Sequence, residues 1–115
     1  ESMNSACAVV AGSGIGAVPF LLKHNYNGLV YKTGRYQEFE RLVSLLCTDK
    51  TLQKRLGTHA YETIVREWNP KEAADRLYQF CEGLLHGKVQ PQKTGPLSPA
   101  PVIAPRKGYW YTRNK

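Results

Sequence analysis

The feature that most constrains this fold is a short apolar run followed at once by three closely spaced glycines. Residues 8–11 read Ala-Val-Val-Ala, and Gly12, Gly14 and Gly16 come directly after them. A run of this length and composition, closed by glycine, favours a strand buried in a parallel sheet. Glycine lets the backbone turn sharply and approach a ligand closely. Because open α/β sheets bind ligands beyond the carboxyl ends of their strands, we expect any site near residues 12–17.

The segments around this run are short. Residues 1–6 are predicted as the end of a helix, and residues 18–22 as one helical turn that tolerates its proline near the start. Residues 25–28 read Asn-Tyr-Asn-Gly, which is turn chemistry, and residues 28–31 are predicted as a second strand. Two strands do not make a stable sheet alone. We therefore expect the sheet to continue in a partner or in additional sequence. The absence of an initiating Met before Glu1 points to a longer parent protein.

Three helices are predicted between residues 36 and 87. The first has apolar residues at a helical period from Tyr36 to Leu46. Asp49 is expected to cap the second, whose apolar row is Leu52, Leu56, Ala60, Ile64 and Trp68. In the third, Asn69 is the expected cap, Pro70 the first residue, and Glu72 the side chain that reaches back to the cap. Its apolar row is Ala73, Ala74, Leu77, Cys81, Leu84 and Leu85, and it ends near Gly87.

Charge and proline content divide the chain at residue 87. Residues 1–87 carry ten Lys and Arg against nine Asp and Glu, whereas residues 88–115 carry six Lys and Arg and no acid. Five prolines interrupt the second part, which we interpret as a Pro-rich basic tail or linker with polyproline II character. Its end combines Tyr109, Trp110 and Tyr111 with basic residues, a composition suited to docking on a polyanion or an anionic membrane.

The cysteines and histidines give no pattern of a metal site. Cys7, Cys47 and Cys81 are far apart and odd in number, which fits neither a disulfide framework nor metal-ligand spacing. Cys47 and Cys81 stand beside apolar residues, where a free cysteine acts as a small apolar side chain. We expect a reducing, cytoplasmic environment. His24, His59 and His86 have no neighbouring ligand at a suitable spacing, so we expect no metal.

One alternative for the glycine motif is dinucleotide binding. Residues 12–17 match the pattern G-x-G-x-x-A after a strand. The acidic residue expected about twenty positions later is replaced by Tyr31 and Lys32. Pro19 and the turn at 25–28 also leave no room for a full helix after the glycines.

A family resemblance covers residue 1 to about residue 85. The sequence resembles the carboxyl-terminal part of the retaining GT-B glycosyltransferases of family 4. The matching stretches are residues 1–11, 15–19 (Ile-Gly-Ala-Val-Pro), 27–31 (Asn-Gly-Leu-Val-Tyr), 56–57, 67–69 (Glu-Trp-Asn) and 73–77. The resemblance implies an α/β fold, a fragment of a Rossmann-like GT-B carboxyl-terminal domain with short parallel strands followed by three helices. Residues 1–87 would be a partial nucleotide-sugar-binding domain, followed by the tail 88–115.

The resemblance also implies a function and a site. The implied activity is transfer of a sugar, with retention, from a nucleotide-sugar donor to a glycan or lipid-linked acceptor, as in polysaccharide biosynthesis. Glu1 takes the place of the second glutamate of the family's Glu–seven residues–Glu motif, so its carboxylate would accept hydrogen bonds from the ribose hydroxyls of the donor. Gly12, Gly14 and Gly16 would lie beside the donor. Phe20 stands where the family often has glutamate after Gly-x-x-Pro.

The same resemblance leaves the catalytic groups outside this sequence. The diphosphate-binding residues and the acceptor domain would precede residue 1, so we expect no catalytic residue here and an inactive fragment. The implied partners are the donor, the acceptor and the missing amino-terminal domain, with no nucleic acid and no cofactor beyond the donor. Contact with the inner face of a membrane stays open. An alternative is a non-catalytic interaction module that docks through its basic tail.

Overall fold

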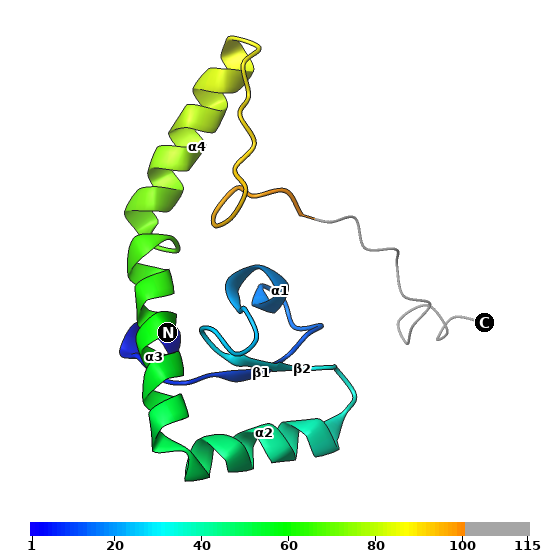
Figure 1. Ribbon diagram of the computed structural model, residues 1–115. Helices are drawn as coiled ribbons and strands as arrows, with labels where there is room; N and C mark the ends of the chain where they lie inside the picture. Colours follow the sequence, from blue (N-terminus) through cyan, green and yellow to red (C-terminus); the bar gives the residue numbers. More distant parts are fainter. Residues whose placement is uncertain (101–115) are drawn as a thin grey trace, which may run out of the picture.

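The computed structural model describes residues 1–100, and the chain there is mixed α/β (Figure 1). The elements in chain order are the 3-10 helix η1 (Met3–Ser5), β1 (Val10–Gly12), α1 (Val18–Leu21), β2 (Leu29–Tyr31), α2 (Tyr36–Thr48), α3 (Lys50–Arg66) and α4 (Pro70–Leu85). The predicted order of strand, helical turn, strand and three helices is confirmed. Strand β1 begins two residues later than predicted and includes Gly12. The aromatic–basic end of the tail lies outside the described residues.

The two strands pair in parallel in one sheet. Val10 is in register with Leu29, and Gly12 with Tyr31. At one end of the ladder the Leu29 N–H donates to the Val9 carbonyl at 2.8 Å, and at the other the Ser13 N–H donates to the Tyr31 carbonyl at 2.8 Å. The parallel pairing predicted from the apolar run at 8–11 is therefore present. Both strands end at the same edge, where the glycine bend begins.

Helices cover both faces of this small sheet. Successive side chains of a strand point to opposite faces, and on each face they pack with helix side chains in an apolar cluster. One cluster combines Leu29 with Leu42 and Leu46 of α2 and Leu56 of α3, and Val10 and Tyr31 pack against it. The other combines Met3, Leu22 and Ala60, and Val9, Ala11 and Val30 pack against it. The sheet is thus the middle layer, with α2 on one side, η1 and α1 on the other, and α3 along both.

The two edges of the sheet are finished differently. On the outer edge of β2, the Val30 N–H donates to Nδ1 of His24 at 3.0 Å, and the Gly28 carbonyl accepts from the Asn25 N–H at 2.8 Å. On β1 the ladder uses residues 9, 11 and 13, which turns the N–H and carbonyl of Val10 to the outside. Within residues 1–100 these two groups of Val10 have no hydrogen-bond partner. The sheet is therefore closed at β2 and open at β1.

Helix α3 holds the amino-terminal segment in place. Asp49 caps the helix as predicted, since its Oδ1 accepts from the Leu52 N–H at 2.8 Å. Gly57 is buried, and a Cβ at this position would lie 2.1 Å from the Ala6 carbonyl oxygen. The absence of a side chain at Gly57 therefore allows α3 to pack directly against the backbone at Ala6. The helix ends at Arg66, so Trp68 lies in the connection to α4 instead of extending the apolar row.

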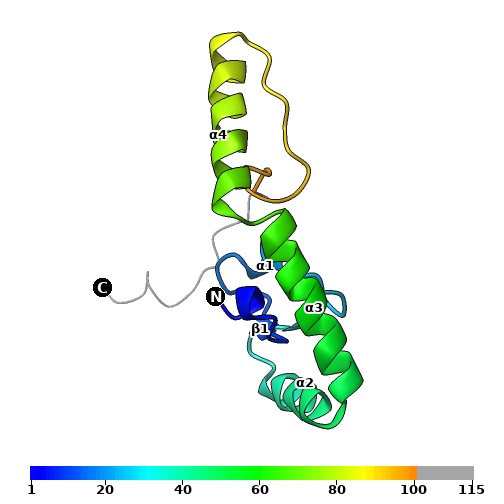
Figure 2. The ribbon, with the colours of Figure 1, turned by 90° about the vertical axis from the view of Figure 1, so that its left-hand side faces the viewer.

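Helix α4 extends from the end of α3, and the chain then returns beside it (Figure 2). Asn69 caps α4 through its Oδ1, which accepts from the Glu72 N–H at 2.9 Å, while its Nδ2 donates to the Val65 carbonyl of α3 at 2.9 Å. The prediction that Glu72 reaches back to the cap is wrong, because its carboxylate instead accepts from Nε of Arg76 at 2.7 Å. Residues 88–100 form no helix or strand and lie against α4.

The apolar row predicted for α4 is not buried in residues 1–100. Leu77, Leu84 and Leu85 are exposed, and α4 contains no buried residue. The expectation that Cys47 and Cys81 pack as apolar side chains is also wrong, because both are exposed. Cys47 follows Leu46 by one position and so points away from the buried side of α2, while Cys81 lies on α4, which contains no buried residue. No helix among the described residues is long and apolar enough to cross a membrane.

Candidate functional site

Hydrogen bonds connect the glycine bend at residues 12–17 to the end of β2. The Gly14 N–H donates to Oγ1 of Thr33 at 2.8 Å, and the Thr33 N–H donates in return to Oγ of Ser13 at 3.4 Å. Together with the bond from Ser13 to the Tyr31 carbonyl, these contacts join the two strand ends into one rim. The bend therefore has a defined position at the carboxyl edge of the sheet.

The three glycines of this bend are required for different reasons. Gly12 is buried, and a Cβ there would lie 3.3 Å from the side chains of Ile15, Tyr31 and Thr33. A Cβ on Gly14 would lie 2.9 Å from Oγ1 of Thr33, the atom that its own N–H binds. Gly16 has open space around it but a φ of +34°, which disfavours a side chain. Gly12 and Gly14 thus serve packing within the rim, and Gly16 serves the turn.

Two backbone donors of the bend face no acceptor in the described part of the chain. The Ile15 N–H donates to the Gly12 carbonyl at 3.1 Å, and the Val18 N–H donates to the Ile15 carbonyl at 2.9 Å. The N–H groups of Gly16 and Ala17 have no such partner within residues 1–100. Both residues are exposed. The bend can therefore offer two adjacent N–H donors to a ligand, fewer than a motif of three glycines suggests.

Glu1 lies at a small hollow beside the same strand end. The hollow has a volume of about 190 Å³, and its walls include Ala11 and Val18, the residues that flank the bend in sequence. Its floor is the apolar face formed by Met3, Leu21 and Ile64. Gly12, Gly14 and Gly16 do not line this hollow. The structure thus brings Glu1 to a hollow shared with the residues on either side of the bend, whereas Gly12 and Gly14 lie against Thr33 and Gly16 against no neighbour in residues 1–100.

A larger cleft of about 670 Å³ lies between α1, the end of α3, α4 and residues 93–99. Phe20 lines it, together with the cations Lys23, Arg66 and Lys93 and the acids Glu62 and Glu67. Arg76 closes one side, since its guanidinium donates to the carbonyls of Thr94 and Pro96. This cleft was not predicted from sequence. It is formed in part by residues 88–100, and no pattern in the sequence indicates that they lie beside α4.

The three histidines do not form a site in the described residues. Nδ1 of His24 accepts from the sheet edge, and Nδ1 of His59 is 3.0 Å from the Tyr26 carbonyl while its ring stacks on Tyr26 at 4.6 Å. His86 ends α4. Within residues 1–100 there is no group of three or more His, Cys, Asp and Glu side chains that could hold a metal ion.

Two ionisable groups on α4 have shifted pKa values, and both are away from the bend. The hydroxyl of Tyr78 donates to Oε1 of Glu82 at 2.8 Å, and this hydrogen bond raises the pKa of Tyr78 above its usual value. The hydrogen bond from Lys71 to Asp75, at 2.6 Å, likewise raises the pKa of Lys71. Both pairs span one helical turn at the surface, so they reflect α4 itself and not a catalytic centre.

No protein-family model, no curated protein and no solved structure shows significant similarity to this chain.

Proposed function

We propose that this chain is part of the donor-binding half of a retaining glycosyltransferase of family 4 with a Rossmann-like GT-B domain. The proposed reaction is transfer of a sugar from a nucleotide-sugar donor to a glycan or lipid-linked acceptor. Within that enzyme the chain would bind the nucleotide of the donor. It would require the amino-terminal domain for catalysis.

The observation that carries this proposal is the position of Glu1 relative to the glycine bend. Strands β1 and β2 are parallel, and the bend follows the carboxyl end of β1, which is where α/β sheets bind ligands. Glu1 shares a hollow with Ala11 and Val18 on either side of the bend. An ionised carboxylate offers two acceptor oxygens that suit the adjacent hydroxyls of a ribose. The exposed N–H groups of Gly16 and Ala17, which have no backbone acceptor in residues 1–100, would donate to the rest of the nucleotide.

The open edge of β1 supports the proposal, which requires that further strands extend this sheet. The outward groups of Val10 have no partner in residues 1–100, while the outer edge of β2 is occupied by His24 and Asn25. Since His24 and Asn25 occupy the outer edge of β2, additional strands would join the sheet beside β1. A domain that supplies strands there would also extend the rim on which the donor binds.

Dinucleotide binding receives less support. Helix α1 has only four residues, as the sequence suggested, so it offers no long helix amino terminus to a pyrophosphate. The Gly14 N–H, which such a fingerprint would direct to the ligand, already donates to Thr33. The described contacts therefore favour the nucleotide-sugar proposal.

The test is a titration of the full 115-residue chain with uridine, guanosine and adenosine diphosphate sugars. The backbone amide signals in NMR spectra are the readout. We expect one of them to shift the amides of Gly16 and Ala17 at millimolar concentration. Glu1→Gln removes an ionised acceptor, which costs about 1.5–3 kcal/mol of donor binding, or about 10- to 150-fold in affinity. Glu62→Gln, a matched change in the separate cleft, should leave the affinity unaltered. No shift with any donor, or equal effects of the two variants, would contradict the proposal.

A further inference from the structure

We propose that one exposed stripe of α3 binds the surface of a membrane rich in anionic phospholipids. The stripe consists of Lys50, Lys54, Thr58, Tyr61 and Val65, all exposed. At about 100° per residue these five positions fall within an arc of about 80° on the helix. The inference is independent of the proposed donor site, which lies at the carboxyl edge of the sheet.

The first half of the stripe is cationic, and its two lysines take part in no ion pair among the described residues, although Asp49 precedes Lys50 in sequence. Lys50 and Lys54 border a shallow hollow of about 560 Å³, whose other walls are Thr51, Thr58, Arg55 and His59, with no acid among them. In residues 1–100 the only ion pairs are Lys71–Asp75 and Arg76–Glu72, both on α4. The two lysines are therefore available to phosphate groups. Threonine hydroxyls beside them add donors of the kind that phosphate oxygens accept.

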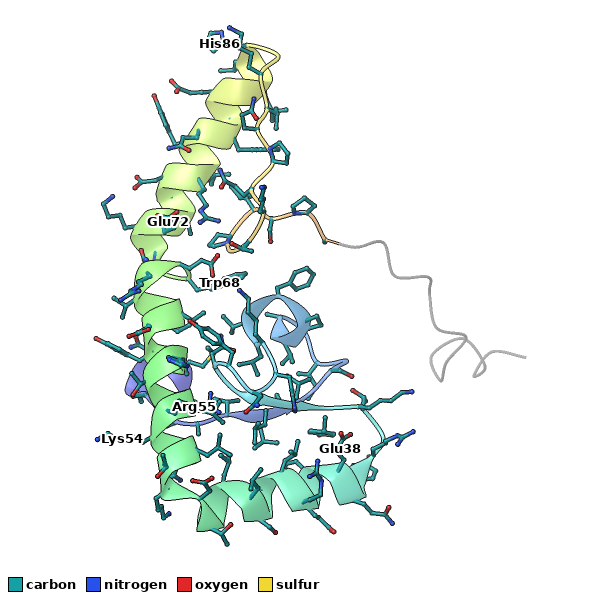
Figure 3. The ribbon with its side chains drawn as sticks, viewed as in Figure 1. Glu38, Lys54, Arg55, Trp68, Glu72 and His86 are labelled. Atoms are coloured by element: carbon teal, nitrogen blue, oxygen red, sulfur yellow. The ribbon has the colours of Figure 1, made fainter. Side chains whose placement is uncertain are left out.

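The neighbouring cation Arg55 is engaged elsewhere, so the cationic part of the stripe consists of the two lysines. Figure 3 shows Lys54 directed away from the sheet and Arg55 directed toward it. The Arg55 guanidinium donates to the carbonyl oxygen of Asn25 at 2.9 Å and to Oδ1 of the same residue at 3.0 Å. Arg55 thus holds the loop before β2 against the helix. We therefore keep it out of the variants below.

The second half of the stripe distinguishes a membrane from a free polyanion. Tyr61 is 45 % exposed and Val65 is 48 % exposed, on the same line as the lysines. Tyrosine and apolar side chains beside lysines are typical of helices that lie in a membrane interface. The charge of residues 88–115, six cations and no acid, has the same sign and adds attraction to an anionic surface.

The experiment measures binding of the full chain to vesicles of phosphatidylcholine with and without phosphatidylserine, at about 0.1 M salt. We expect binding only to the anionic vesicles. Neutralising Lys50 and Lys54 together (K50Q/K54Q) should weaken binding about 30-fold, because each lysine near such a surface contributes about one kcal/mol. The matched variant K23Q/R41Q removes two exposed charges from other elements and should change binding less than about twofold.

A second pair of measurements tests the apolar half and separates a lipid surface from a polyanion. Y61S/V65S should weaken vesicle binding severalfold but leave binding to heparin unchanged. Circular dichroism of each variant establishes that it is folded. Equal losses in K50Q/K54Q and K23Q/R41Q would overturn the proposal in favour of net charge. An unchanged vesicle affinity in Y61S/V65S, with a loss in K50Q/K54Q, would overturn it in favour of a soluble polyanion.

Discussion

Replacing Gly57 by alanine tests the packing of η1 on α3. An alanine Cβ would lie 2.1 Å from the Ala6 carbonyl oxygen and 3.1 Å from the Ala6 carbonyl carbon. An ordinary contact is about 3.5 Å, so the backbone at Ala6 must retreat by more than about 1 Å. Overpacking costs about 1–3 kcal/mol, and the high end applies here because backbone atoms cannot rotate away. Alanine returns about 1 kcal/mol through its helix propensity.

The expected net result for Gly57→Ala is a loss of about 2 kcal/mol in the free energy of unfolding. For a folded part of this size that corresponds to a fall of about 10 °C in Tm. Urea unfolding followed by circular dichroism at 222 nm measures it. Thr58→Ala is the matched control, because it is the next residue on α3 and is exposed, and it should change the stability by less than about 0.5 kcal/mol. A Gly57→Ala protein as stable as the wild type would refute the contact.

Three further predictions concern individual side chains. Asn27→Ala should cost about 3 kcal/mol of unfolding free energy in urea titrations, because the buried amide accepts from the Lys23 N–H and donates to the Leu21 carbonyl and to Thr63. Arg76→Gln should release residues 88–100, which limited proteolysis would detect as faster cleavage there, while an unchanged rate would disprove the contact. The phenol of Tyr78 should titrate above its usual pKa by absorbance at 295 nm, and Glu82→Gln should lower that pKa. Because the folded-state pKa is raised, the associated stabilisation is present below about pH 10 and is lost as the pH rises further.

The sequence was informative wherever local rules decide the structure. The caps Asp49 and Asn69 are where their side-chain chemistry places them, and each accepts from the N–H three residues later. The run at residues 8–11 leads into a strand, and the turn at 25–28 adopts the positive φ that asparagine tolerates. These features depend on a few neighbouring residues, so a single sequence is sufficient to find them.

Prediction was less successful where distant segments meet. Periodicity placed Leu77 and Leu84 on an apolar face, but it cannot say whether another element covers that face, and in residues 1–100 none does. Glu72 could have bonded the cap or Arg76, and the second is realised. For the candidate site, the glycines were found but not the contact of Gly14 with Thr33, nineteen residues away.

Asn69 has a consequence for how α3 and α4 can move. Its amide donates to the last turn of α3 and accepts from the first turn of α4, so one planar group sets the angle between the two rods. The same side chain therefore contacts both helices at their junction. An aspartate here would retain the cap but lose the donor. We then expect the angle between α3 and α4 to vary through rotation at residues 67–69.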